Sequence, residues 1–151
     1  MIKKYALVTG ASSGIGLEIS KILASIGFSL VLVARREEKL KEVTKTLINK
    51  YGITADYFIG DLENPNTPKT IYDFCHKKGY FISLLVNNAG YALPDKFHKT
   101  SMEAEEKFLR VLGVSVIALT KLFLIDMIKA KQGKIMMISS VAAFAPPSSI
   151  Q

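Results

Sequence analysis

Two hydroxyl groups stand at the end of the last apolar run of the sequence, in the stretch GKIMMISS. Residues 134–139 predict a short buried strand, and Ser140 follows it directly. Serines at the carboxyl end of a buried strand in an open α/β sheet often face the crevice where a ligand binds. Because side chains alternate along a strand, Ser139 and Ser140 point to opposite sides. The alternative is that Ser140 only ends the strand and bonds nearby backbone.

A glycine-rich turn near the amino terminus has the composition of a phosphate site. The stretch LVTGASSGIGLEIS places Gly10, Gly14 and Gly16 between a predicted strand and a predicted helix. A pyrophosphate needs backbone N–H groups at close range and the positive end of a helix, and glycines leave that approach open. The spacing is G-x-x-x-G-x-G, which differs from the common G-x-G-x-x-G fingerprint. The predicted cofactor-binding residues of this turn are Gly10, Ser12, Ser13, Gly14, Ile15 and Gly16.

Two arginines follow the second predicted strand, in VLVARRE. The place where an acidic residue would meet a free ribose 2′-hydroxyl holds Ala34, and Arg35 and Arg36 come next. A guanidinium matches a phosphate dianion with two parallel hydrogen bonds. The pattern therefore favours NADP(H) over NAD(H), and Arg35→Asp is expected to weaken NADPH binding far more than NADH binding. The alternative is that both arginines are surface charges at the start of a helix.

Two further strand ends carry polar residues. Asp61 follows the third predicted strand in IGDLEN. Two interpretations of its carboxylate are equally favoured: it accepts a hydrogen bond from an adenine amino group, or it caps the next helical turn. Asn87, Asn88, Ala89 and Gly90 end the fourth strand in LLVNNAG. Two amides followed by small residues suit an edge that a ligand approaches closely, although ordinary turn chemistry would select the same residues.

The elements that must position these residues alternate along the chain. Continuous apolar runs separated by helix-length segments predict an α/β domain with a parallel sheet covered on both faces, in one domain over residues 1–151. The predicted strands are 5–9, 29–34, 53–59, 82–86 and 134–139. The predicted helices are 14–26, 37–50, one from about 65 to 78, and a long one over 101–131, with a loop at 92–100.

Composition narrows the possible partners. The net charge of +7 admits an anionic ligand, but the lysines are spread singly along predicted helices, which indicates a solvated surface rather than a nucleic-acid site. Cys75 is the single cysteine, which suits a cytoplasmic location. The apolar stretch 111–128 carries Lys121 and Asp126, so we expect no membrane span. We expect no metal site.

Four motifs occur in order along the chain. They are T-G-x-x-x-G-I-G at 9–16, Asp61, N-N-A-G at 87–90 and G-x-I-x-x-I-S-S at 133–140. Together they resemble the classical short-chain dehydrogenase/reductase superfamily over essentially the whole chain. The resemblance implies a Rossmann-type three-layer fold with strand order 3-2-1-4-5. It also implies hydride transfer between a nicotinamide cofactor and a small carbonyl or alcohol substrate. The resemblance further implies that Asp61 and Leu62 contact the cofactor. It implies that one wall of the cofactor site is formed by Asn88, Ala89 and Gly90.

The same resemblance identifies catalytic positions and one departure. The family serine maps onto Ser140, and the family asparagine maps onto Ser115, which lacks amide donors and has a plain packing role as its alternative. The family Tyr-x-x-x-Lys pair has no counterpart, because no tyrosine here is followed by lysine four residues later. The resemblance places that pair just past Gln151. We therefore expect a chain truncated before its proton donor, without the later strands, and inactive by itself.

The long helix over 101–131 matches a segment that helps to form a subunit interface in the family. The resemblance thus implies a homo-oligomer, and without its neighbours the helix is expected to expose apolar residues partly. The residues expected to be exposed are Leu112, Leu119, Leu122 and Phe123.

The sequence is compatible with three functions. The first is an NADP(H)-dependent oxidoreductase of the short-chain type. The second is a catalytically inactive remnant that binds nucleotide or serves as an interaction module. The third is a methyltransferase that uses S-adenosylmethionine, which shares glycine-rich turns but is disfavoured by Arg35 and the serine pair.

Overall fold

Strands and helices alternate along the chain in the computed structural model, which describes residues 4–144. The strands are β1 (Lys4–Thr9), β2 (Ser29–Ala34), β3 (Ala55–Ile59), β4 (Phe81–Asn87) and β5 (Lys134–Met137). The helices are α1 (Gly14–Ser25), α2 (Glu37–Tyr51), α3 (Thr67–Lys77), α4 (Met102–Leu109) and α5 (Ser115–Lys129). Short 3₁₀ turns cover Phe97–Lys99 and Val141–Ala143.

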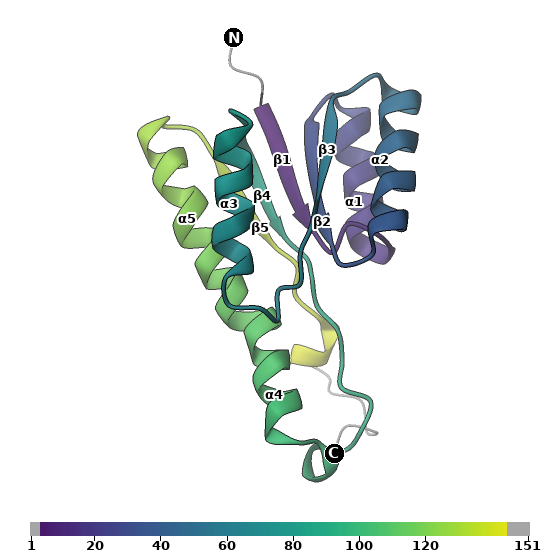
Figure 1. Ribbon diagram of the computed structural model, residues 1–151, viewed down its shortest axis with the longest axis vertical. Coiled ribbons are helices and arrows are strands. Elements are labelled where there is room, and N and C mark those ends of the chain that lie inside the picture. Colours follow the sequence, from purple (N-terminus) through teal and green to yellow (C-terminus); the bar gives the residue numbers. More distant parts are fainter. Residues whose placement is uncertain (1–3, 145–151) are drawn as a thin grey trace.

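All strand pairs in the sheet are parallel, and the order is β3-β2-β1-β4-β5. Helices α1 and α2 lie on one side of the sheet, while α3 and α5 lie on the other (Figure 1). This arrangement confirms the predicted Rossmann-type three-layer α/β fold. Because the strands are parallel, the chain segments that leave their carboxyl ends share one edge of the sheet. Helix α4 continues past this edge (Figure 1).

Alternating side chains of the central strands build two separate cores. On β1, Tyr5 and Leu7 face the layer formed by α3 and α5, whereas Ala6 and Val8 face the layer formed by α1 and α2. All four side chains are at most 4% exposed. The continuous apolar run of β1 is thus explained by burial on both faces, as expected for the middle strand of a parallel sheet.

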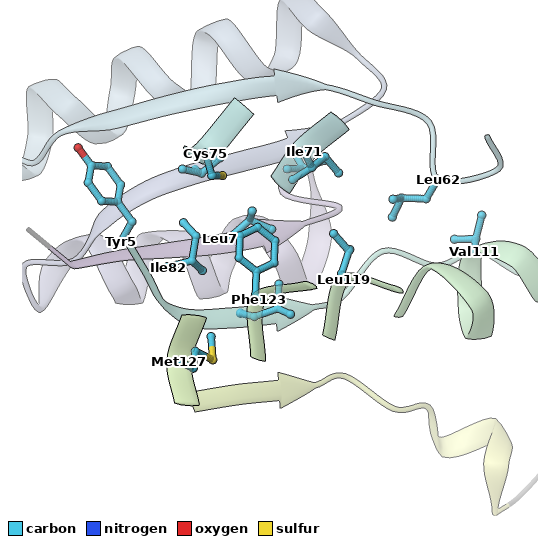
Figure 2. Packing of buried hydrophobic residues seen from close by; sticks show 13 residues of the cluster. Tyr5, Leu7, Leu62, Ile71, Cys75, Ile82, Val111, Leu119, Phe123 and Met127 are labelled. Atoms are coloured by element: carbon cyan, nitrogen blue, oxygen red, sulfur yellow. The ribbon is translucent and has the colours of Figure 1, made fainter. Parts of the chain in front are cut away.

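The core under α3 and α5 reaches the carboxyl edge of the sheet. In Figure 2, Ile71 and Cys75 of α3 lie in the upper part of this core. Phe123 and Met127 of α5 lie in its lower part. A further pair of core residues lies past the strand arrowheads in the same view (Leu62 and Val111). The core therefore supports directly the segments that leave the strand ends.

The predicted helix over 101–131 is interrupted. Helices α4 and α5 are joined by a π-helical turn, Arg110–Val114, and α5 ends at Lys129. The expected exposure of Leu119 and Phe123 was wrong, because both pack into the core and are at most 2% exposed. Leu112 is 43% exposed, and Leu122 is half-buried.

The outer face of this helical run is strongly apolar. Met102–Lys129 is long and apolar enough to cross a membrane by length and composition, because its most apolar 18-residue stretch has a mean hydropathy of 2.1, and 28% of that stretch is buried. Core helices of soluble proteins meet the same criterion. Asp126 on this run binds His76 of α3, with 2.8 Å between Oδ2 and Nε2. The absence of a membrane span stays a prediction.

Most other boundaries differ from the predictions by one or two residues. Strand β5 ends at Met137, so Ser139 and Ser140 lie in the loop after it, and β3 begins at Ala55 instead of residue 53. The expected single domain over 1–151 includes residues 1–3 and 145–151, and the expected Tyr-x-x-x-Lys pair falls past Gln151. All of these lie outside the described residues.

Candidate functional site

The turn between β1 and α1 presents open backbone at a helix N-terminus. Gly10 and Gly14 have φ of 67° and 55°, a conformation that side-chain-bearing residues rarely adopt. A Cβ added at Gly14 would have no atom within 4 Å, so the turn faces open space there. The first N–H groups of α1 lie at this turn, and a helix N-terminus attracts anions.

Gly16 has a packing role in this structure, and its contact with the cofactor stays a prediction. A Cβ at Gly16 would lie 2.5 Å from the carbonyl oxygen of Gly10 and 2.4 Å from Nδ2 of Asn88. Gly16 is buried behind the turn and is not part of the cavity wall. Its lack of a side chain allows α1 to pack against the turn that the cavity uses.

The segment after β4 is fastened to the glycine turn by Thr9. The Thr9 hydroxyl oxygen accepts hydrogen bonds from the backbone N–H groups of Asn88, at 2.9 Å, and Ala89, at 3.0 Å. It also donates to the carbonyl oxygen of Val86 at 3.3 Å. In return, Nδ2 of Asn88 donates to the Thr9 carbonyl oxygen at 2.8 Å. These bonds fix two of the cavity walls relative to each other.

Asn87 precedes this segment and faces the helix layer. Its side chain is 4% exposed, and Nδ2 donates to Thr120 Oγ1 at 3.3 Å. Nδ2 also lies 3.5 Å from the sulfur of Met137. Asn87 thus ties β4 to α5 and β5 and does not line the cavity.

The two arginines after β2 have different partners. Arg36 donates from Nη2 to Ser13 Oγ at 2.8 Å and to Ser12 Oγ at 3.1 Å. Its guanidinium therefore lies over the glycine turn. Arg35 points to acidic residues after β3, with Nη1 3.5 Å from Oε1 of Glu63 and 3.9 Å from Oδ2 of Asp61. Both arginines line the same cavity.

Asp61 caps its own turn in this structure. Its Oδ1 accepts from the backbone N–H of Glu63 at 3.0 Å, and its carbonyl oxygen accepts from the Thr67 hydroxyl at 2.6 Å. The neighbouring Leu62 is 6% exposed and anchors the turn in the core. Asp61 therefore caps the turn in this structure, and the contact of Asp61 with adenine stays a prediction.

A cavity of about 430 Å³ unites these segments at the carboxyl edge of the sheet. Apart from Gly16, every residue predicted to bind cofactor lines it. Five lining residues were not among those predicted: Val33, Ala34, Gly60, Tyr91 and Val111. Tyr91 had a usable indication in the sequence, because it follows N-N-A-G directly. Within residues 4–144 there is no cluster of three metal-ligating side chains.

Tyr91 closes the cavity beside Glu63. Its ring packs edge-on against Phe108 of α4, with 5.7 Å between ring centroids. Burial raises the pKa of the Tyr91 phenol, and the charge of Glu63 and a hydrogen bond to it raise that pKa further. The phenol is therefore protonated at neutral pH.

The two predicted catalytic serines are both engaged with backbone. Ser140 Oγ accepts from the N–H of Ala142 at 3.1 Å, and the residue is exposed. Ser115 is 2% exposed and donates to the carbonyl oxygen of Val111 at 2.8 Å, directly after the π-helical turn. Their catalytic roles stay predictions. π-Helical turns are frequent at functional sites, which makes the position of Ser115 notable.

Residues 4–150 match the sequence model of a family described as short chain dehydrogenase. The chain is similar to a fatty acyl-CoA reductase from Acinetobacter baylyi, with 37% identity over 94% of this chain and 48% of that protein. The chain spans about half the length of the curated relatives it matches.

Solved structures agree with this match. A short-chain dehydrogenase from Sphingobium yanoikuyae in complex with NADPH has a TM-score of 0.90 and 28% identity, over 97% of this chain and 57% of that one. L-Sorbose reductase from Gluconobacter frateurii, complexed with NADPH and L-sorbose, has a TM-score of 0.93 and 27% identity, over 99% of this chain and 57% of that one.

Proposed function

The chain belongs to the short-chain dehydrogenase family, and on that premise we propose that it forms the cofactor-binding part of an NADP(H)-dependent oxidoreductase. The reaction is hydride transfer between NADP(H) and a carbonyl or alcohol substrate. The observation that carries the cofactor choice is Arg36, which lies on the hydroxyl groups of Ser12 and Ser13 beside the glycine turn. A guanidinium and two hydroxyls are the donors that a ribose 2′-phosphate requires.

The residues of the cavity fit this cofactor. The open backbone at Gly14 and the N-terminus of α1 suit the pyrophosphate. Arg36, with Arg35, would hold the 2′-phosphate, and Asp61 would meet the adenine. The segment from Asn88 to Gly90 would form the wall on the far side of the turn.

The hydrogen bonds that Ser140 and Ser115 already make determine what each hydroxyl can still donate or accept in the reaction. Bound NADPH supplies the hydride. Ser140 Oγ already accepts from the Ala142 N–H, so its proton is the group that it offers to a substrate oxygen. Ser115 Oγ gives its proton to the Val111 carbonyl oxygen, so it serves a neighbouring water only as an acceptor. Ser115 thus differs from an asparagine, whose amide also donates.

The remaining assignments of the proposal rest on the outer surface and on composition. The exposed apolar residues of α5, including Ile117, Ile125 and Ile128, suit an interface between copies of the protein. The scattered lysines and the single Cys75 suit a cytoplasmic enzyme with a small-molecule substrate, without nucleic-acid or membrane partners.

A second candidate function is nucleotide binding without catalysis. None of the six tyrosines of the chain is followed by lysine four residues later, so the chain holds no counterpart of the family's acid–base pair. The burial-raised pKa of the Tyr91 phenol also makes it a poor general base.

Binding by variants tests the cofactor assignment. We expect Arg36→Ala to weaken NADPH binding about 10-fold to 100-fold, the value of a hydrogen bond to a charged group, while NADH binding changes little. Lys39→Ala is the matched control, since it removes one positive charge on the exposed side of α2. Titration of cofactor fluorescence measures both. Equal losses for NADPH and NADH in Arg36→Ala would show that Arg36 does not read the 2′-phosphate.

Turnover separates the two candidates. The 151-residue chain is mixed with NADPH and a panel of ketones, and the absorbance of the reduced nicotinamide is followed. Turnover by this chain favours the oxidoreductase and removes the second candidate. Tight NADPH binding without turnover by this chain fits both candidates, so the same assay is repeated with an otherwise identical, extended chain, whose failure to turn over would favour nucleotide binding alone.

A further inference from the structure

Glu63 is an acidic side chain next to Arg35, which lines the cavity, and none of the roles predicted above involves Glu63. Its Oε1 lies 3.5 Å from Nη1 of Arg35, and its side chain is 25% exposed, compared with 61% for Arg35. Asp61 adds a second carboxylate 3.9 Å from the same nitrogen. Arg35 is therefore turned toward carboxylates, whereas Arg36 lies on hydroxyl groups.

The position of Glu63 is fixed by the fold. Its backbone N–H donates to Asp61 Oδ1 at 3.0 Å, and the N–H of Asn64 donates to the Asp61 carbonyl oxygen at 3.1 Å, so Glu63 sits within a closed turn after β3. Glu63 also interacts with Tyr91, whose pKa is raised by burial and by Glu63. Glu63 is thus held between Tyr91 and Arg35.

We propose that Glu63 is a specificity-determining residue, which lowers the preference for a 2′-phosphorylated cofactor by holding Arg35. This inference rests on the proposed function, because it assumes that Arg35 and Arg36 meet the 2′-phosphate. Arg36 is already placed over the glycine turn. Arg35 reaches the phosphate only by leaving Glu63, so binding of the phosphate costs the Arg35–Glu63 ion pair.

The expected size of this effect is modest. The Arg35–Glu63 pair is partly exposed, and exposed ion pairs contribute about twofold to fivefold to an equilibrium. A nucleotide without the 2′-phosphate leaves the pair intact, so removal of the Glu63 charge changes its binding little. The ratio of the two affinities, and not either affinity alone, therefore reports the role of Glu63.

The experiment uses 2′,5′-ADP and 5′-ADP as probes, because they differ only in the 2′-phosphate. Calorimetric titration at low ionic strength gives both dissociation constants. We expect Glu63→Gln to tighten 2′,5′-ADP binding about twofold to fivefold and to leave 5′-ADP binding unchanged. The gain decreases at high salt, because partly exposed charges are screened. Glu63→Ala removes the same charge and gives the same gain if the amide variant does not fold.

Asp73→Asn is the matched control. It also converts one exposed carboxylate to an amide, but its partner is Lys69 on α3, and neither residue lines the cavity. We expect Asp73→Asn to leave the ratio of the two affinities as it is in the wild type. A gain equal to that of Glu63→Gln would mean that only net charge matters, and would overturn the proposal.

A double-mutant cycle with Arg35→Gln tests the route of the effect. With Arg35 absent, Glu63→Gln no longer changes the affinity ratio if Glu63 acts by holding Arg35. A gain that persists in the Arg35→Gln background would overturn that route. If the wild type prefers 2′,5′-ADP and Glu63→Gln leaves the ratio unchanged, this inference fails while the proposed function stands. If the wild type binds both probes equally, the proposed cofactor choice and this inference both fail.

Discussion

Thr9→Val removes the hydroxyl that joins the glycine turn to the segment after β4, while keeping the shape of the side chain. Thr9 is 1% exposed, and its oxygen accepts from the N–H groups of Asn88 and Ala89. Valine cannot accept either bond. Two backbone donors at the cavity wall therefore lose their acceptor, and the Val86 carbonyl oxygen loses its donor.

The cost follows from these bonds. An unsatisfied buried polar group costs about 1–3 kcal/mol, and both N–H groups are only partly buried, so we expect a loss of about 2 kcal/mol in the free energy of unfolding. For a chain of this size, that loss lowers the melting temperature by about 4–8 °C. The Asn88 amide would also lose its alignment with the turn, so NADPH binding should weaken as well.

Urea unfolding followed by circular dichroism measures the change. The midpoint should fall while the denaturant dependence stays the same, since the surface exposed on unfolding is unchanged. Thr46→Val is the control, because the Thr46 hydroxyl is exposed and bonds only the carbonyl oxygen of Glu42 in its own helix. A loss below about 0.5 kcal/mol in Thr9→Val, or an equal loss in the control, would refute the reasoning.

Four further residues give predictions about stability and reactivity. Gly16→Ala should lower the free energy of unfolding by about 1–3 kcal/mol in urea unfolding, because its Cβ would lie 2.5 Å from the Gly10 carbonyl oxygen. Gly113→Ala should be neutral or stabilising, since its Cβ meets nothing within 4 Å. Burial raises the pKa of the Cys75 thiol from 9.0 to about 12, so a thiol reagent at pH 8 should label it only after unfolding. As pH rises above 9 the unfolded thiol loses the proton that the folded thiol keeps, so the urea midpoint should fall from pH 9 toward pH 12. Ser101→Ala should lower the free energy of unfolding by about 1 kcal/mol, because the Ser101 hydroxyl caps α4 by accepting from the Ala104 N–H; an unchanged urea midpoint would contradict this.

Most element boundaries were predictable to within one or two residues because they depend on local pattern, whereas the strand order was implied by the family resemblance. The run from Leu30 to Ala34 is apolar throughout, and β2 has the predicted bounds Ser29–Ala34. The residues of the glycine turn and of N-N-A-G follow strand ends directly, so a parallel sheet brings them to one edge. Twelve of the thirteen residues predicted to bind cofactor therefore line one cavity.

The features that the sequence did not predict depend on contacts between segments that are far apart along the chain. Gly16 was predicted to contact the cofactor, which stays a prediction, whereas its tight packing against Asn88 joins segments far apart in the sequence and has no local pattern. Leu119 and Phe123 were expected to be partly exposed because the helix was expected to lack neighbours, but both lie on the face of α5 that packs into the core with α3 and the sheet. The pairing of Arg35 with Glu63 joins two strand ends and has no local pattern.

The most direct test of the central claim is the affinity of the unmodified chain for NADPH and NADH, measured by calorimetry in one buffer at one ionic strength. We expect NADPH to bind at least about 10-fold more tightly, because only its 2′-phosphate bonds the arginines beside the glycine turn. Equal dissociation constants for the two cofactors, or no heat of binding with NADPH, would contradict the claim.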